Sequence, residues 1–420
     1  MSPALETPCA VQDAAGARQD HRRPAACRFD DALSGWSLRL DQPAERIAVH
    51  RQADLPDAWA AIAQAGRQGH WVALLLDYEL GDWLNDPPAA PRPTQPIEPQ
   101  PRLTALVFRQ ASEQGQRPDP RRRIAHAARP SPADPDDTHW AIHDAQASQT
   151  LAQYRLAIAA IRQGIARGDY YQINHTIALQ LDWPAALPPD QAYHALIRQH
   201  PVAHGAFIQD GARQVLSLSP ELFVARRGNT LYTRPMKGTA PRHTDPIQDR
   251  AAGQALLRSE KNRAENLMIV DLLRNDLGRI ATPGSVQVPA LFDLEAYPSV
   301  WTLTSSIQAE APGASLADIL RALFPCGSIT GAPKLAAMQA IRSLEGRRRG
   351  IYCGSVGWLA PDGDFSLNVA IRTLELHGRR AQFGVGGGIV FDSDADQEWQ
   401  ECHWKARILN GWNAAGKPAP

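Results

Sequence analysis

The chain has 420 residues, enough for two domains or one large composite with a substantial buried core. Its 44 basic and 44 acidic residues cancel, so the composition gives no reason to expect a nucleic-acid or membrane partner. Five cysteines without metal-type spacing, no apolar leader and no run of transmembrane length predict a cytoplasmic protein without disulfides.

The first third of the chain shows the weakest pattern. Residues 1–27 are polar and alanine-rich and predict a disordered extension, whereas 28–108 show an α+β pattern with strands expected at 71–76 and 103–108. Between those strands, residues 87–101 contain seven prolines and predict an extended surface loop. The polar stretch 109–138 predicts a linker to a C-terminal catalytic region, 139–412.

The C-terminal region begins with regular elements. Apolar spacing predicts a helix over 148–166, and 170–175 is typical of a strand. Residues 222–226 and 230–234 flank Arg227-Gly228-Asn229, which predicts a hairpin. This hairpin would bring Glu221 close to Lys237 across two strands.

Lys237 stands in the segment Pro235-Met236-Lys237-Gly238-Thr239, where proline and glycine interrupt strand pairing and let the backbone approach a ligand. A lysine at such a break can serve as an amine nucleophile if burial or a nearby cation lowers its pKa. Glu221 would then be a proton donor with a raised pKa. The local pattern equally allows an ordinary cross-strand ion pair.

Two later helices carry carboxylates. A helix over 251–276 places Glu265 on an apolar stripe, where either an arginine or magnesium would be its partner. In the last helix, which Asp394 is expected to cap, Glu398, Glu401 and Lys405 share one face. That face favours either a hard cation or a solvated Glu–Lys ladder.

Two strand segments offer groups for anionic ligands. The run 384–388, Gly-Val-Gly-Gly-Gly, lets backbone N–H groups approach a carboxylate, although glycine-rich turns are common. Arg372 alternates with apolar residues, so it is either an exposed strand charge or a fork for a carboxylate.

Three motifs together resemble the chorismate-utilising enzymes. They are Ser217-Leu218-Ser219-Pro220-Glu221, the Lys237 segment and Ser328-Ile329-Thr330-Gly331-Ala332-Pro333-Lys334, followed by the carboxylate-rich last helix. The resemblance is dense over about 140–412 and thin over 60–108. It implies an α+β fold like that of anthranilate synthase component I, with large mixed β-sheets and helices packed outside.

The lysine at position 237 resembles the aminodeoxychorismate synthase branch, since anthranilate synthases carry alanine there. The resemblance implies that Glu221 protonates the departing C4 hydroxyl of chorismate. Lys237 would attack C2, and ammonia would then displace the covalent adduct at C4. Glu265 and Glu401 resemble magnesium ligands, with Glu398 nearby.

The remaining implied contacts concern the substrate. The residues that would grip its carboxylates are Tyr352, Arg372, Gly386, Gly388 and Lys405, and Thr330 would lie against the ring. Gln172 stands where the water-using members carry a lysine base, and Thr302 stands where many relatives have histidine. The resemblance further implies a heterodimer with a glutaminase subunit that supplies ammonia. The alternatives are anthranilate synthase component I and a non-catalytic chorismate-binding subunit.

Overall fold

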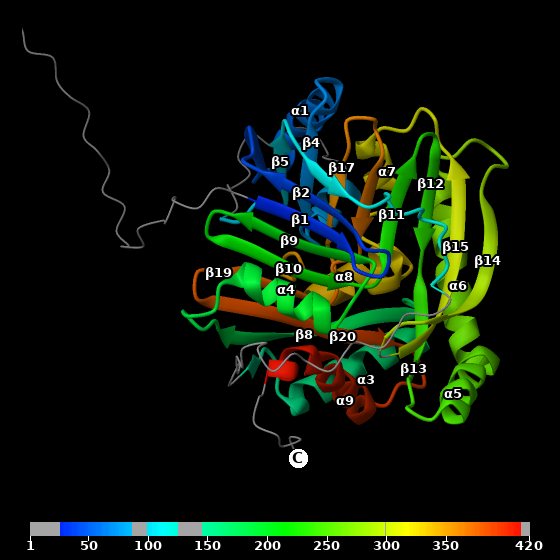
Figure 1. The fold of residues 1–420 in the computed structure, drawn as a ribbon. Coiled ribbons are helices and arrows are strands. Elements are labelled where there is room, and N and C mark those ends of the chain that lie inside the picture. The colour runs from blue at the N-terminus through cyan, green and yellow to red at the C-terminus, as the bar shows by residue number, and fades with distance from the viewer. Residues whose placement is uncertain (1–25, 86–98, 125–144, 299, 413–420) are drawn as a thin grey trace, which may run out of the picture.

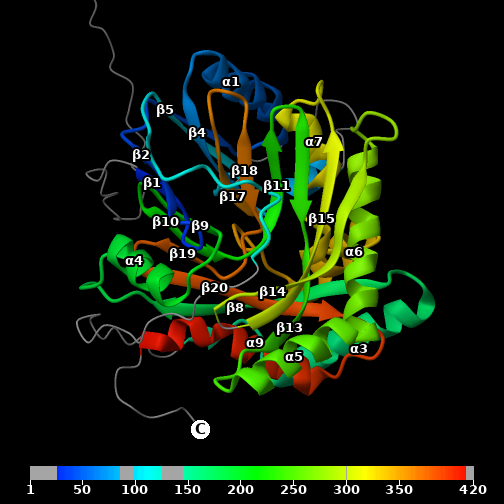
Figure 2. The same ribbon diagram turned by 45° about the vertical axis from the view of Figure 1, so that its right-hand side comes forward.

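The computed structural model describes residues 26–85, 99–124, 145–298 and 300–412. In these ranges the chain forms two ten-stranded sheets, and in every described pair of neighbouring strands the two run antiparallel. The expected α+β fold with large sheets is therefore confirmed, but the sheets are not mixed in strand direction. Figures 1 and 2 show the long strands β8 and β20 of one sheet running across those of the other, such as β12 and β15.

The first sheet contains strands from both the N-terminal and the C-terminal parts of the chain. Its order is β16-β8-β20-β19-β10-β9-β1-β2-β6, with β7 also paired to β8. Its strands, in chain order, are β1 (Ala26–Asp31), β2 (Trp36–Asp41), β6 (Ser112–Gln114), β7 (Gln146–Ala147), β8 (Gln172–Asp182), β9 (His204–Asp210), β10 (Arg213–Ser219), β16 (Gly331–Ala332), β19 (Thr373–His377) and β20 (Arg380–Ile389).

The second sheet has the order β13-β15-β12-β11-β18-β17-β4-β5-β3, with β14 paired to β15. Its strands are β3 (Glu45–Val49), β4 (Trp71–Leu76), β5 (Leu103–Phe108), β11 (Leu222–Arg227), β12 (Thr230–Arg234), β13 (Met236–Pro241), β14 (Gln287–Ala296), β15 (Val300–Glu310), β17 (Ser355–Leu359) and β18 (Phe365–Asn368).

Nine α-helices cover these sheets in the part of the chain that the structure describes. Helices α3 and α9 contact each other and strand β20, while α6 lies against β13 and β15 (Figure 1). The helices are α1 (Leu55–Arg67), α2 (Leu80–Asn85), α3 (Leu151–Arg167), α4 (Pro189–Gln199), α5 (Pro246–Arg258), α6 (Glu260–Gly278), α7 (Leu316–Leu323), α8 (Lys334–Glu345) and α9 (Ala395–Ala406). None of the helices in these ranges is long and apolar enough to span a membrane.

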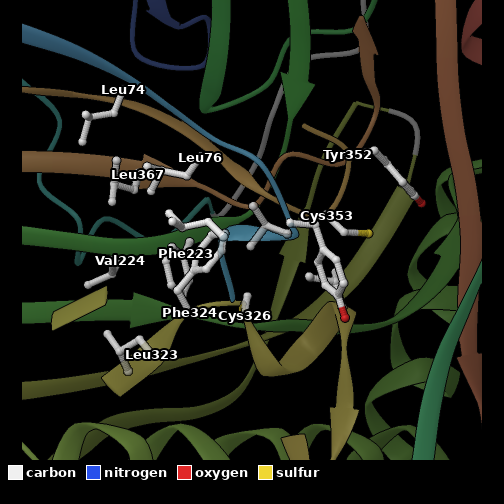
Figure 3. Packing of buried hydrophobic residues seen from close by; sticks show 14 of the residues in the cluster. Leu74, Leu76, Phe223, Val224, Leu323, Phe324, Cys326, Tyr352, Cys353 and Leu367 are labelled. Atoms are coloured by element: carbon white, nitrogen blue, oxygen red, sulfur yellow. The ribbon is translucent and has the colours of Figure 1, made fainter. Parts of the chain in front are cut away.

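The main hydrophobic core joins the two sheets. Phe223 of β11 packs edge-on against Phe324, with 5.9 Å between the ring centroids. Figure 3 shows these rings with Leu74 and Leu367 on one side and with Tyr352 beyond Cys353 on the other. Because this one core includes residues from both sheets, the two sheets hold fixed positions relative to each other.

The N-terminal part of the chain is not a separate unit. Strands β1, β2 and β6 extend the first sheet, whereas β3, β4 and β5 extend the second. Each set of strands buries its apolar faces in a core shared with C-terminal strands, so residues of 28–108 and of 139–412 build the same two sheets. Strand β1 begins at Ala26, and residues 1–25 lie outside the described residues.

The described part of the expected linker over 109–138 contacts both sheets. Strand β6 pairs with β2, and the Ile124 side chain is buried while its N–H donates to Glu295 Oε1 over 2.8 Å. Residues 125–144, and residues 86–98 of the proline-rich loop, lie outside the described residues.

The predicted local elements are mostly confirmed. Strands β4 and β5 have the expected bounds. Helix α3 corresponds to the helix expected over 148–166 and begins after a capping box at Thr150. The single helix expected over 251–276 is instead divided into α5 and α6. Ser259 separates them because its extended backbone ends α5 and its side chain accepts from Asn262 N–H at the start of α6.

Candidate active site

A cavity of about 410 Å³ lies where α6, α9, β13 and β20 meet. Its size suits a small organic ligand. Ten of the eleven predicted site residues line it: Glu221, Lys237, Glu265, Tyr352, Arg372, Gly386, Gly388, Glu398, Glu401 and Lys405. The structure thus brings together residues that are up to 184 positions apart in the chain.

Glu221 and Lys237 meet at Ser328. The Ser328 hydroxyl donates to Glu221 Oε1 over 2.9 Å, and Lys237 Nζ donates to the Ser328 backbone oxygen over 3.0 Å. The two side chains are not a cross-strand pair of the β11–β12 hairpin. Pro235 has no N–H and separates β12 from β13, and Lys237 lies opposite Leu303 of β15.

The surroundings shift the pKa values of both Glu221 and Lys237. Burial raises the pKa of Glu221 to about 7, although its Ser328 hydrogen bond and the nearby Lys237 oppose the change. Burial lowers the pKa of Lys237, and Lys405 acts in the same direction while Glu221 and Glu265 oppose it. The same site therefore favours the protonated form of the acid and the neutral form of the amine, compared with exposed groups.

The last helix carries an acidic group into the cavity. Asp394 caps α9 by accepting from the N–H groups of Asp396 and Gln397, as expected. Glu398 accepts from the Ser393 hydroxyl over 2.8 Å, and burial raises the pKa of this carboxyl. Glu401 lies one turn further along and forms an ion pair of 2.7 Å with Lys405.

Gly387 of β20 lies directly beneath these side chains. A Cβ atom built on it would be 3.0 Å from Glu398 Oε2, 3.8 Å from Lys405 Nζ and 3.9 Å from Glu401 Oε1. The missing side chain of Gly387 is what lets both carboxylates approach the strand.

The donor set of this corner suits a hard cation. Glu265 reaches the cavity from α6 and faces the same space as Glu398 and Glu401 of α9. Within the described ranges, no three His, Cys, Asp or Glu side chains are already gathered as a metal cluster. Carboxylate oxygens are nevertheless the type of ligand that Mg²⁺ prefers, and this ion usually keeps several waters.

The lining of the cavity also includes a buried arginine, Arg372. Arg372 has a left-handed backbone with φ of 49°, and burial lowers its pKa. No carboxylate of the described residues forms an ion pair with Arg372, which leaves its guanidinium for an anionic ligand. The Tyr352 ring lies against Gly384 of β20, where a Cβ atom would overlap it.

Thr330 is the one predicted site residue outside the lining of the cavity, and its contact with the ring stays a prediction. Its side chain is fully buried, and its hydroxyl donates to the Cys326 backbone oxygen over 2.8 Å. Gln172 also lies behind the wall, where its Nε2 would be 2.5 Å from a Cβ built on Gly388.

The sequence interpretation missed several lining residues, chiefly Ser328, Lys261 and Asn262. Ser328 begins the Ser-Ile-Thr-Gly-Ala-Pro-Lys motif, so its position was a usable signal. Lys261 and Asn262 precede Glu265 by about one helical turn and share its face. Their spacing of three and four residues from Glu265, a predicted site residue, could have identified them.

The glycines of β20 provide a test of this packing. We expect Gly386→Ala to lower stability by about 1–3 kcal/mol, because the new Cβ would meet the His175 backbone oxygen, which cannot move aside. Gly387→Ala is the matched control, since its closest contact is the flexible end of Glu398. Urea unfolding of both variants measures the difference. Equal losses of stability would contradict the backbone contact.

Known proteins resemble this chain in sequence and in fold. A family model described as chorismate binding enzyme matches residues 12–411. Aminodeoxychorismate synthase component 1 of Salmonella typhimurium is 44% identical over 269 residues, which cover 63% of this chain and 58% of that protein. The Escherichia coli protein of the same name is 42% identical over 282 residues, covering 66% and 61%. The matched part is thus about three fifths of the length of these relatives.

Other similar proteins carry different names. Anthranilate synthase component 1 of Streptomyces coelicolor is 38% identical over 281 residues, covering 66% of this chain and 54% of that protein. Among solved structures, anthranilate synthase component I from Streptococcus pneumoniae matches with a TM-score of 0.73, 24% identity and coverage of 89% and 92%. The menaquinone-specific isochorismate synthase from Escherichia coli matches with a TM-score of 0.71, 19% identity and coverage of 96% and 92%. These two structures support the fold.

Proposed function

The chain belongs to the family of chorismate binding enzymes, and from this premise we propose that it converts chorismate and ammonia to 4-amino-4-deoxychorismate. The observation that carries the proposal is the Glu221–Ser328–Lys237 arrangement inside the cavity. The relatives with 42–44% identity that are named aminodeoxychorismate synthase component 1 support it. The product would serve p-aminobenzoate and folate synthesis.

The chemistry follows from the two shifted groups. The neutral amine of Lys237 attacks C2 of chorismate and forms a C–N bond, while the ring double bonds shift and the C4–O bond breaks. Glu221, protonated near neutral pH, gives its proton to the departing hydroxyl, which leaves as water. Ammonia then bonds to C4, the double bonds shift back and Lys237 leaves C2 as an amine.

The cationic and acidic walls would hold the two carboxylates of the substrate. Arg372 and Lys405 supply charge, and the N–H groups around Gly386 and Gly388 are close enough for hydrogen bonds to a ligand. Glu265, Glu398 and Glu401 would hold Mg²⁺. When bound, this ion would orient the ring carboxylate and neutralise its charge.

Removal of one carboxylate tests the metal assignment. We expect Glu401→Gln to weaken Mg²⁺ binding about tenfold or more and to lower activity together with it, because a charged oxygen ligand is lost. Asp396→Asn is the control, since Asp396 lies on the same helix but pairs with Arg155 over 2.8 Å. Isothermal titration with MgCl₂ gives the affinities. Full activity of the unmodified chain in excess chelator would contradict the assignment.

Ammonia for this reaction would come from a separate glutaminase subunit, which would form a heterodimer with this chain. The name component 1 carried by the similar proteins supports a second component. We also place the reaction in the cytoplasm, and the four described cysteines, all free and buried, are consistent with a reducing compartment.

Anthranilate formation is the principal alternative, because Streptomyces coelicolor anthranilate synthase component 1 is also similar. Two observations favour amination at C4. Lys237 would compete with ammonia for C2, and the Thr302 hydroxyl already donates to the Gly238 backbone oxygen over 3.0 Å. A threonine has no group that titrates near neutral pH to assist pyruvate elimination.

The deciding experiment supplies the purified chain with chorismate, MgCl₂ and an ammonium salt, and identifies the product by mass. Aminodeoxychorismate without pyruvate release is expected. Fluorescent anthranilate with pyruvate would identify the alternative enzyme. Chorismate binding without turnover would identify a non-catalytic subunit.

A further inference from the structure

Lys405 occupies a position between the acidic corner and the space for the substrate. Its Nζ forms the 2.7 Å ion pair with Glu401 Oε1 and also donates to the Gly386 backbone oxygen over 2.7 Å. These two contacts place the ammonium beside β20, although the Lys405 side chain is 39% exposed and that of Glu401 is 50% exposed. Its field also reaches Lys237 across the cavity and lowers the pKa of that amine.

The Lys405 ammonium has two possible anionic partners, which are the Glu401 carboxylate and a carboxylate of the substrate. Glu401 is a proposed ligand of Mg²⁺, and a cation bound there competes with Lys405 for this carboxylate. A substrate carboxylate, in turn, would attract Lys405 away from Glu401. Binding of either Mg²⁺ or the substrate thus breaks the Glu401–Lys405 ion pair, and this favours binding of the other ligand.

We propose that Lys405 is an internal counter-ion of Glu401 that couples the binding of Mg²⁺ to the binding of the substrate carboxylate. The inference rests on the proposed function, because it takes chorismate as the carboxylate ligand. In the unliganded chain the ammonium balances the charge of the acidic corner. When chorismate binds, Lys405 moves to its carboxylate and Glu401 becomes free for the metal. By linkage, Mg²⁺ strengthens chorismate binding by the same factor.

Lys261 offers a matched control. It lines the same cavity from α6 and acts on Glu398 through its charge, but it forms no ion pair among the described contacts of the cavity. Lys261→Met removes one positive charge near the acids without removing the exchange of partners. Lys405→Met removes one positive charge and also the exchange of partners.

The test is isothermal titration of Mg²⁺ with and without saturating chorismate, in ammonia-free buffer. All proteins carry Lys237→Ala, which keeps chorismate unreacted. In the Lys237→Ala parent we expect chorismate to tighten Mg²⁺ binding about fivefold or more. Addition of Lys405→Met should tighten Mg²⁺ binding about threefold without chorismate and leave only the part of the further gain that comes from direct contact between the ion and the ring carboxylate. Addition of Lys261→Met should keep the gain.

The outcomes separate this inference from the proposed function. A parent that binds both ligands independently, or a Lys405→Met variant that keeps the full gain, would overturn the coupling while leaving the reaction in place. A parent to which chorismate does not bind would overturn both. Equal loss of the gain in the Lys261→Met variant would assign the effect to overall charge and would also overturn the role of Lys405.

Discussion

Lys237→Ala is expected to reduce formation of aminodeoxychorismate by at least about a thousandfold. The amine supplies the bond that forms at C2, and alanine leaves no nucleophile at this position. The Lys237 amine lies 3.0 Å from the Ser328 backbone oxygen within the cavity, and burial lowers its pKa, which favours the neutral form compared with an exposed lysine. Turnover with an ammonium salt and product detection by mass measure the loss.

Two further measurements make this prediction specific to a nucleophile. Lys237→Arg keeps the positive charge but not a titratable amine, so it should be as inactive as the alanine variant. Intact-protein mass spectrometry of the unmodified chain with chorismate and no ammonia should show an added mass of chorismate less one water, and Lys237→Ala should not. Normal turnover by either variant would defeat the covalent mechanism.

Glu221→Gln should lower activity by about a hundredfold to ten-thousandfold, because an amide cannot give a proton to the leaving hydroxyl. The pKa of Glu221 is raised to about 7, so the protonated acid dominates below that pH. In the unmodified chain kcat/KM should therefore fall as the pH rises through about 7. The residual activity of Glu221→Gln should lack this decrease.

The same pKa makes an independent prediction about stability. The folded pKa of about 7 is above the ordinary value of 4.5, so burial opposes ionisation. The stability associated with the neutral carboxyl is full below about pH 4.5 and is lost as the pH rises through 7. The amide side chain of the Glu221→Gln variant does not ionise. The thermal midpoint of this variant should therefore rise relative to that of the unmodified chain as the pH increases from pH 5 to pH 8. A constant difference over this range would show that the carboxyl is not buried as described.

Several elements follow from neighbouring residues alone. Strands β4 and β5 are runs of apolar residues, and α3 is an apolar stripe that begins at a capping threonine. Asp394 starts α9 for the same local reason. Such patterns repeat every two to four residues, so the printed chain is sufficient to find them. The family resemblance that rests on the three motifs also identified eleven site residues, and ten of them line the cavity.

Which strands become neighbours is a different question, because it depends on segments far apart in the chain. Nothing local to 28–108 shows that its strands divide between two sheets and share cores with C-terminal strands. Pairing of Lys237 with β15 instead of β11 likewise depends on Leu303, 66 positions away. Chain neighbours therefore determine helices, strands and the identity of the reactive groups. The burial of apolar faces shared by distant strands determines that Glu221 and Lys237 meet at Ser328 and that Thr330 turns inward.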